Sequence, residues 1–379
     1  MTDPSIDIRR VTRQDLPALR AFILRTYGAG ATHKHEDRLH WQFINTPIRS
    51  SSESDPAIWV ASVGMRIIGM IGVQDGMLQL DGERIPAGWI VDVMVDPDFR
   101  GLGLSHRIHD AIRKERDVLV TLTMAPATRR VAERAGCVTL GPTYQFVLPH
   151  QLGARTVRRY LTTKTETWPR LAPAIRVFNA SRIGPVTVAA VARALALVAG
   201  IGRPRAALDG YSVEEVMRFP QELQPFWDRI SDGFPAAFER SVDFLNWRFC
   251  DCPELGYRRF LLRRDGALKG YLVTRLGVAA ELPVGVVVDL LASPEDRLSL
   301  DALATLARKI LMPNTEYLEA AASTALWRDV LRRAGFCATR TMRPTVVCND
   351  PLLSERILAR AAHWHFTKAD HDWDQIHPV

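Results

Sequence analysis

The residues best suited to do chemistry form a glycine-rich turn at residues 100–105, with the sequence RGLGLS. Glycines let a backbone turn tightly, so that several N–H groups converge at the N-terminus of the helix that follows. A nest of N–H groups of this kind binds a pyrophosphate without needing a lysine. The alternative is a tight turn that binds nothing. The elements on either side of the turn indicate which interpretation is correct.

A strand and a helix flank this turn. Residues 89–95 are an almost continuous apolar run with one acid, which predicts a central strand. Residues 104–114 carry apolar side chains at helical spacing, and a second strand–helix pair follows at 118–122 and 127–134. A turn between such a strand and such a helix favours the phosphate-binding interpretation.

The elements belong to a domain that occurs twice. The segment D-x-L-x-W-x-F at 37–43 recurs at 243–249, an offset of 206 residues. Two further matches follow in the same order, at offsets of 197 and 199: VDV with VDL, and ERAGC with RRAGF. Ordered matches with nearly constant offsets predict two copies of one domain with small insertions between them. We expect an N-terminal copy, a basic linker, a C-terminal copy and a tail, at 1–149, 150–206, 207–350 and 351–379.

With these segments in view, the chain resembles the GNAT superfamily of acyl-CoA N-acyltransferases. Residues 95–103, VDPDFRGLG, are similar to the family signature V-x-P-x-[YF]-R-G-x-G. The resemblance implies an α/β (α+β) fold of two tandem domains, each a mixed, mostly antiparallel central sheet flanked by helices. It also implies an N-acyltransferase, most simply an N-acetyltransferase, with acetyl-CoA or another acyl-CoA as its co-substrate.

The resemblance assigns cofactor contacts to the first copy. The pantetheine chain would add like a strand alongside Met94 and Val95. The second copy reads RLSL at 297–300 where the first reads RGLG, and the loss of both glycines removes the left-handed freedom that a nest needs. We therefore expect only the first copy to bind CoA. Its pyrophosphate would be held by the backbone of Arg100, Gly101, Leu102, Gly103, Leu104 and Ser105.

Two residues are candidates for catalysis. An N-acyltransferase must remove a proton from an ammonium group, and Asp92 lies on the predicted central strand beside the cofactor. The alternative is a structural role, because the second copy keeps Asp289 at the same position. Many family members carry a tyrosine that protonates the departing thiolate, where this chain has Ala132. Tyr144 could supply that acid, or it could simply pack in a closing strand.

The acceptor is expected near the loop after the first helix. His33, His35 and Glu36 lie there, as candidate substrate-binding residues. With Asp37 and His40 they form a cluster whose spacing could suggest a metal, but no cysteine or further histidine completes a zinc ligand set, so we expect no metal. Trp41 is either a platform on which a sugar stacks or a core residue. Doubling of the domain and the terminal WHFTKADHDWD are similar to GNAT enzymes of bacterial polysaccharide and glycan pathways, which implies an amino sugar or a lipid-linked glycan as the amine acceptor.

Charge is concentrated in the linker. The whole chain carries +7, and ten basic residues against one acid give the segment 151–205 a charge of +9. It also contains an apolar run at 186–200, too short to span a membrane. The linker is either a solvated connection or a surface for anionic membrane, glycan-lipid or nucleotide phosphates. Nucleic acid is not expected, because aromatic interleaving and a binding motif are missing.

Composition favours a cytoplasmic protein. The N-terminus has no apolar h-region, and five cysteines form no disulfide framework. Acyl-CoA is a cytoplasmic metabolite, so we expect a cytoplasmic enzyme, with peripheral contact at the inner membrane face if its acceptor is lipid-linked. A second hypothesis is a regulatory module that responds to a nucleotide such as a cyclic dinucleotide. Its support is the basic linker and the arginine pairs Arg9/Arg13 and Arg259/Arg263.

Overall fold

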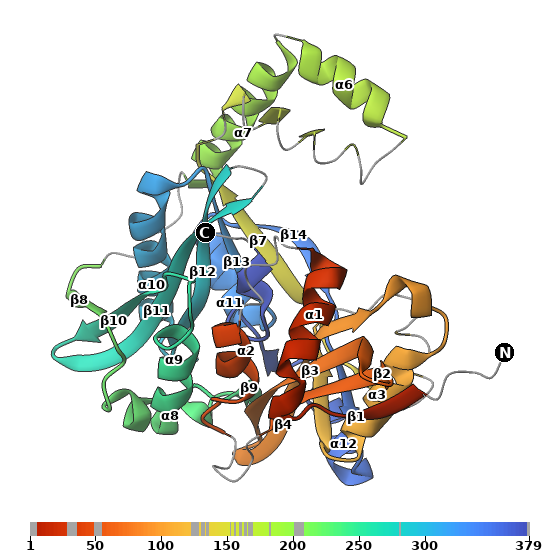
Figure 1. The fold of residues 1–379 in the computed structure, drawn as a ribbon. Coiled ribbons are helices and arrows are strands. Elements are labelled where there is room, and N and C mark those ends of the chain that lie inside the picture. Colours follow the sequence, from red (N-terminus) through yellow and green to blue (C-terminus); the bar gives the residue numbers. More distant parts are fainter. Residues whose placement is uncertain are drawn as a thin grey trace. The chain divides into compact units, whose positions relative to one another are not determined.

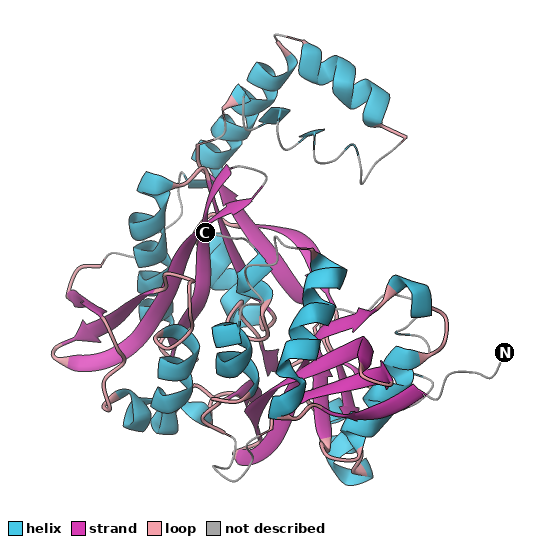
Figure 2. Cartoon of the chain, in the orientation of Figure 1, coloured by secondary structure: helices cyan, strands magenta, loops and turns pink. Residues whose placement is uncertain are grey.

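The computed structural model describes residues 6–28, 36–48, 55–122, 129, 133, 136–151, 153–154, 157–158, 161–162, 165, 170–181, 183–200, 208–279 and 282–376. Figure 1 labels its helices and strands, and Figure 2 shows the helices in cyan and the strands in magenta. The chain forms two compact units, each assembled from three stretches. Unit 1 consists of Met1–Pro142, Phe219–Glu254 and Met342–His365, and unit 2 of Thr143–Arg218, Leu255–Thr341 and Phe366–Val379.

Unit 1 is built on a sheet with the strand order β1-β2-β3-β4-β5-β15-β6, to which β9 and β16 add beside β3. Neighbouring strands are antiparallel except for the parallel pairs β4–β5 and β9–β16. The strands are β1 (Ile6–Arg10), β2 (Ile58–Val63), β3 (Arg66–Leu80), β4 (Glu83–Val95), β5 (Val118–Thr121), β6 (Val138–Thr139), β9 (Ala236–Phe238), β15 (Thr345–Cys348) and β16 (Trp364–His365). The helices are α1 (Leu16–Tyr27), α2 (Glu36–Phe43), α3 (Leu104–Arg113), α8 (Leu223–Ser231), α9 (Val242–Phe249) and α12 (Pro351–Ala359).

Unit 2 has a sheet with the order β14-β7-β13-β12-β11-β10-β8. Here β12 and β13 are parallel, and β7–β13, β11–β12, β10–β11 and β8–β10 are antiparallel. The strands are β7 (Thr143–Pro149), β8 (Tyr211–Val216), β10 (Arg258–Arg264), β11 (Ala267–Ala279), β12 (Leu282–Ala292), β13 (Tyr317–Ala322) and β14 (Cys337–Met342). The helices are α6 (Ala172–Ala180), α7 (Gly184–Gly200), α10 (Arg297–Leu311) and α11 (Ala325–Arg333). The expected mixed, mostly antiparallel sheets flanked by helices are confirmed.

The two sheets share one plan, in which each copy gives a strand to the other sheet. Unit 1 contains the order β4-β5-β15-β6 and unit 2 the order β12-β13-β7-β14. In unit 1 Val346 of β15 pairs with Val120 of β5, and in unit 2 Phe146 of β7 pairs with Ala320 of β13. The compact units therefore do not coincide with the contiguous segments 1–149 and 207–350 expected from the repeat.

The repeated D-x-L-x-W-x-F segments form α2 and α9, which both belong to unit 1. The indole Nε1 of Trp41 donates to the Trp247 carbonyl at 2.8 Å, and Trp247 Nε1 donates to the Trp41 carbonyl at 3.0 Å. The two rings stack with their centroids 4.9 Å apart. Both side chains are buried. The repeat thus builds a reciprocal contact between its own two copies.

Packing of α3 on the unit 1 sheet fixes the position of the glycine-rich turn. Leu104, Ile108 and Ile112 recur at every fourth position, so they lie on one face of the helix. All three are buried in a cluster that includes Trp59 of β2 and Ile71 of β3. Because this face is held by the core, the first residues of α3 stay close to the end of β4.

Candidate functional site

β4 carries a β-bulge near its end. Gly72 of β3 pairs with Val91 and Met70 pairs with Met94, so Asp92 and Val93 together lie opposite one residue of β3. Asp92 has a φ of +54°, in the left-handed region that aspartate tolerates better than most residues. A bulge of this kind increases the local twist of its strand and re-aims its side chains.

Beyond this bulge β4 no longer pairs with β5. The parallel pairing joins Gly88 to Leu119 and Trp89 to Val120, and within the described residues it stops there. On its other side β4 stays paired with β3 up to Val95. The last residues of β4 therefore present one strand edge to which an extended, amide-containing chain could add. Met94 is buried, Val95 is half-buried, and the Val93 side chain is 51% exposed.

The glycine-rich turn follows directly and ends at the N-terminus of α3. Gly101 and Gly103 have φ values of +85° and +68°. A Cβ at either position would meet nothing within 4 Å, so glycine is needed for its backbone conformation and not for space. Gly103 is the N-cap of α3 and has no side chain to cap it. The first N–H groups of a helix lack intrahelical acceptors, so they can bind an anion here.

A buried carboxylate holds the start of this turn. Asp96 accepts a hydrogen bond from the Asp98 amide at 3.2 Å and from Arg66 at 2.9 Å, and Arg25 lies 3.5 Å away. Burial alone would raise the pKa of Asp96, but the Arg66 and Asp98 hydrogen bonds and the charges of Arg66 and Arg25 together hold that pKa below its usual value. Asp96 is therefore ionised and neutralised by arginine, so it does not oppose an anion bound at the nest.

The predicted acceptor residues are only partly described. His33 and His35 lie outside the described residues. Glu36 begins α2, is exposed, and has Arg20 at 3.9 Å and His40 at 4.0 Å. Trp41 is buried with its ring against Trp247, which favours the core alternative over a platform for a sugar.

The second catalytic candidate belongs to the other unit. Tyr144 lies on β7, which is part of the unit 2 sheet, whereas Asp92 lies in unit 1. The guanidinium of Arg328 sits over the Tyr144 ring, 4.9 Å from its centroid. Neither unit by itself brings the two candidates together, so a joint role of Asp92 and Tyr144 stays a prediction.

The helix of unit 2 that corresponds to α3 has a closed N-terminus. Asp296 is the N-cap of α10, and its carboxylate accepts from the Ser299 amide at 3.0 Å and from the Ser299 hydroxyl at 2.8 Å. No residue from 297 to 300 has a positive φ. A carboxylate at a helix N-terminus fills the place that a bound phosphate would take and repels it.

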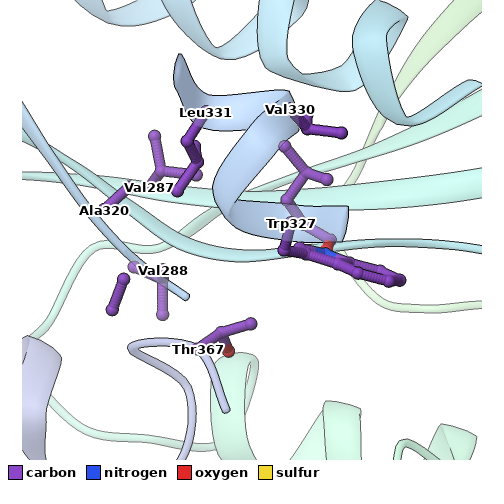
Figure 3. Close-up of a pocket in the computed structure, with 9 residues that line it drawn as sticks. Val287, Val288, Ala320, Trp327, Val330, Leu331 and Thr367 are labelled. Atoms are coloured by element: carbon purple, nitrogen blue, oxygen red, sulfur yellow. The ribbon is translucent and has the colours of Figure 1, made fainter. Parts of the chain in front are cut away.

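The strand edge of unit 2 that corresponds to the end of β4 is also occupied. β12 and β13 pair in parallel only from Val284 to Val286, and beyond that a small apolar pocket separates them. Trp327 of α11 lines this pocket, and its indole Nε1 donates to the Leu290 carbonyl of β12 at 2.9 Å. The other lining residues are Val287, Val288, Leu290, Ala320, Ala321, Val330, Leu331 and Thr367, most of which Figure 3 shows.

The repeat offsets show which residues of the first copy correspond to Leu290 and Trp327. Leu290 corresponds to Val93 at the offset of 197, and Trp327 corresponds to Thr128 at the offset of 199. In unit 2 the Trp327 indole therefore donates a hydrogen bond to the Leu290 carbonyl, at the strand edge where a bound amide would have to pair. No motif in the sequence indicates this role of Trp327. A comparison of the two copies position by position shows the tryptophan, but not the carbonyl that it contacts.

Part of the C-terminal tail completes the core of unit 2. The Thr367 hydroxyl bonds the Asp289 carboxylate at 2.9 Å, and Tyr271 donates to the same carboxylate at 2.7 Å. Lys368 is fully buried, pairs with Glu319 at 2.8 Å and lies 5.1 Å from the Trp373 ring centroid. Asp289, the repeat counterpart of Asp92, is thus a buried structural residue.

Four further expectations concern a metal, a membrane span, the cysteines and a nucleotide site. The described residues hold no group of three His, Cys, Asp or Glu side chains placed to bind a metal. Over the same residues, no helix has both the length and the apolar character to cross a membrane. The five cysteines are free thiols. Of the arginines proposed to grip a nucleotide, Arg9 bonds Asp15 at 2.7 Å and Arg263 lies 3.5 Å from Glu214.

The segment that contains the glycine-rich turn is similar to a known protein family. Residues 7–137 match a family model described as the acetyltransferase (GNAT) domain. This part of the chain is GNAT-like. The match ends near Cys137, so it includes β4, the glycine-rich turn and α3. It supports an acyl-CoA-dependent N-acyltransferase.

Solved structures resemble a longer part of the chain. A GCN5-related N-acetyltransferase from Anabaena variabilis is 11% identical, with a TM-score of 0.57 over 90% of this chain and 72% of its own. Another from Kribbella flavida is 13% identical, with a TM-score of 0.54 over 90% and 70%. An N-myristoyltransferase from Saccharomyces cerevisiae with bound myristoyl-CoA is 10% identical, with a TM-score of 0.53 over 92% and 80%. These likenesses show the fold. A search of the curated proteins found no match.

Proposed function

We propose that this protein transfers an acyl group, most simply acetyl, from acyl-CoA to an amine. One observation carries the proposal: α3 begins at Gly103, which has no side chain to cap it, one short turn after the end of β4, which within the described residues pairs with β3 but not with β5, and all of this lies within the residues that match the GNAT model. An anion site and an open strand edge in immediate succession suit the two parts of CoA. The N–H groups of residues 100–105 would hold the pyrophosphate, and the edge at Met94 and Val95 would bond the pantetheine amides.

Asp92 is the proposed general base. It lies two residues before Met94, the first residue that would hold the pantetheine arm, and it belongs to the bulge of β4. In this proposal the carboxylate takes a proton from the acceptor ammonium, and the neutral amine then attacks the thioester carbonyl. The C–N bond forms, the C–S bond breaks, and the CoA thiolate leaves and is protonated. Tyr144 remains the candidate for that last proton.

We further propose that each chain binds one acyl-CoA. Support comes from unit 2, where Asp296 closes the N-terminus of α10 and Trp327 takes the Leu290 carbonyl. Both features fill positions that the cofactor would need. Unit 2 then serves the fold or shapes the acceptor site.

An amino sugar of cell-surface polysaccharide biosynthesis is the proposed acceptor, either soluble or lipid-linked. Its support is the likeness of the doubled domain and the terminal WHFTKADHDWD to glycan-pathway enzymes, with His33, His35 and Glu36 as the expected contacts. A small-molecule amine is the alternative acceptor. We place the reaction in the cytoplasm, where acyl-CoA is available, with peripheral contact at the inner membrane face for a lipid-linked acceptor. A nucleotide effector has less support, since Arg9 and Arg263 already face carboxylates.

Calorimetry with acetyl-CoA tests the cofactor site. The wild-type protein should bind with a stoichiometry near one, and Gly103→Asp should weaken binding by at least about tenfold. The substitution puts a negative charge at the phosphate site and forces a non-glycine residue to a φ of +68°, a strain of about 1–2 kcal/mol. Gly266→Asp is the matched control, because Gly266 has a φ of +76°, open space around it, and lies in the β10–β11 turn of unit 2.

The outcomes separate the claims. No acetyl-CoA binding by the wild type, or equal binding by Gly103→Asp, would contradict the proposed site. A stoichiometry of two would leave the activity standing and overturn the claim that unit 2 is closed. Equal weakening by Gly266→Asp would assign the effect to a general loss of stability.

A further inference from the structure

An apolar surface on helix α7 is left open to solvent. Val186 and Val191 are 53% exposed, Val188 is 42% exposed, and Ala190 and Ala194 are also exposed. Among the described side chains of α7, only Pro185 and Ala189 are buried. A helix that is apolar on all sides is ordinarily covered, because exposed apolar surface of this kind is unfavourable in water.

The surface continues onto the turn and helix before it. Val177 of α6 is 74% exposed and Ile183 in the turn is 77% exposed, with Leu171 exposed ahead of α6. The turn itself is tight: the Ser181 hydroxyl accepts from the Gly184 amide at 2.9 Å, and a Cβ on Gly184 would lie 2.7 Å from the Phe178 ring. Figure 1 shows α6 and α7 as consecutive helices joined by this turn. We call α6, the turn and α7 the α6–α7 hairpin.

Charge around the hairpin has one sign. Arg158, Arg170 and Arg176 are exposed, and the sequence adds Arg182 and Arg193 within the same stretch. Glu166 is the one acid between residues 151 and 205. The Arg158 guanidinium donates to the Ser181 carbonyl at 3.3 Å, and Asn179 donates to the Arg158 carbonyl at 3.0 Å, so this arginine is tied to the hairpin.

Exposed valines flanked by arginines, without balancing acids, match the surface of an anionic bilayer. The apolar side chains would enter the acyl boundary while the guanidinium groups meet lipid phosphates. The helix cannot be a span: its 17 residues cover about 25 Å, against about 30 Å of hydrocarbon, and Arg193 interrupts it. A second copy of this chain would bring two basic surfaces together, which disfavours self-association.

We propose that the α6–α7 hairpin is a docking surface for membranes that contain anionic lipid. It lies flat at the interface, with valines and isoleucine inserted and arginines on the headgroups. This surface belongs to unit 2 and contains none of the residues assigned to the acyl-CoA site. The inference therefore does not depend on the acyltransferase proposal, although it would bring the enzyme to a lipid-linked acceptor.

Vesicle co-sedimentation of the full chain tests the docking surface. Phosphatidylcholine vesicles serve as the neutral probe and vesicles with added phosphatidylglycerol as the anionic one. The wild type should sediment with the anionic vesicles, and about 1 M salt should weaken the binding because it reduces the Debye length to about 3 Å. Val186→Asp with Val191→Asp should reduce binding by about tenfold or more, since carboxylates enter the interface poorly and repel its phosphates.

A matched control separates the effect of the α6–α7 hairpin on binding from the effect of net charge. Met65→Asp with Met217→Asp changes the charge of the protein by the same amount and removes two side chains that are 94% and 84% exposed. This double variant should bind as the wild type does. Arg170→Gln with Arg176→Gln should lose preference for anionic lipid. Circular dichroism and a thermal melt confirm that each variant is folded.

Four results would overturn the proposal. Equal binding to both vesicle types would show that the surface does not recognise anionic lipid, and binding to neither type would show that the segment is only a linker. Equal loss in the methionine control would assign the effect to net charge. A wild-type dimer that Val186→Asp with Val191→Asp converts to a monomer, without vesicle binding, would make this face an interface between copies of the chain.

Discussion

At the scale of single residues, Asp92 shows where the sequence is sufficient and where it is not. The apolar run at 89–95 predicts the strand and places Asp92 on it, as the structure confirms. The bulge that gives Asp92 a φ of +54° depends on its partner strand, because Gly72 and Met70 set the pairing on either side. No local pattern in residues 89–95 encodes that register, so the direction of the carboxylate could not be predicted.

Asp92→Asn separates the charge of this residue from its backbone conformation. Asparagine has the same shape and also tolerates the left-handed region, so the bulge should persist. If Asp92 is the general base, kcat should fall by about 10²-fold or more while the Kd for acetyl-CoA stays unchanged. Steady-state kinetics and calorimetry measure the two quantities.

The repeat offers a control within the same chain. Asp289→Asn alters the equivalent residue of unit 2, which accepts hydrogen bonds from Tyr271 and Thr367 in a buried setting. This change should lower the melting temperature and leave kcat close to the wild-type value. If Asp92→Asn behaves in the same way, Asp92 has the structural role that was its alternative.

At the scale of elements, equivalent segments can be recognised from sequence, but their contacts cannot. The match of 37–43 with 243–249 predicts that both segments adopt the same structure, and α2 and α9 do. That the two helices also pack against each other follows from their places in three dimensions, which an offset of 206 residues does not contain. For the same reason Trp41 could be assigned to the core or to a sugar platform, and only the position of Trp247 favours the core.

The Trp41–Trp247 contact should be worth several kcal/mol to the fold. Truncating either buried tryptophan to alanine should lower the free energy of unfolding by about 3–5 kcal/mol. Each loss includes the same stacking and the same pair of hydrogen bonds, so the double variant should cost less than the sum of the two single ones. Denaturant unfolding of the four proteins completes this cycle.

A conservative substitution tests whether Trp41 is instead a platform on which a sugar stacks. Trp41→Phe keeps an aromatic ring for stacking and removes the N–H that the Trp247 carbonyl accepts, which should cost about 1–3 kcal/mol. Acceptor KM should stay unchanged. A variant with wild-type stability and a raised acceptor KM would instead favour a sugar platform at Trp41.

The glycine-rich turn is the element whose backbone conformation the sequence predicts best. Its function in the proposal depends on backbone conformation, which glycine at 101 and 103 dictates locally. The contacts that occupy the equivalent site of unit 2 are harder to predict from sequence. Loss of the two glycines was readable from RLSL, but the Asp296 cap and the Trp327 contact to Leu290 involve positions separated in sequence. The sequence predicted that unit 2 lacks the nest, and the structure adds what occupies its place.

At the scale of the whole molecule, the sequence predicts a duplication, but it does not predict that the two copies exchange strands. β7 and β15 are short strands at equivalent positions of the two copies, and nothing in their residues names a partner strand. Local sequence therefore gives no preference between pairing within one copy and pairing across copies. The pairing of β7 with β13 and of β15 with β5 sets the composition of both units.

This exchange predicts how the chain behaves when its linker is cut. We expect that cleavage at a specific protease site inserted between residues 203 and 207 leaves two pieces that co-elute in native size-exclusion chromatography. The N-terminal piece carries β7, which lies within the unit 2 sheet, and the C-terminal piece carries β15, β9 and β16, which belong to the unit 1 sheet. Separating the pieces would remove three strands from the unit 1 sheet and one from the unit 2 sheet, and would leave unpaired backbone groups in the core, at a large cost in free energy. The pieces should part only in denaturant, and the N-terminal piece expressed alone should be unfolded or aggregated. Two separately eluting, folded pieces would show instead that each copy closes its own sheet in solution.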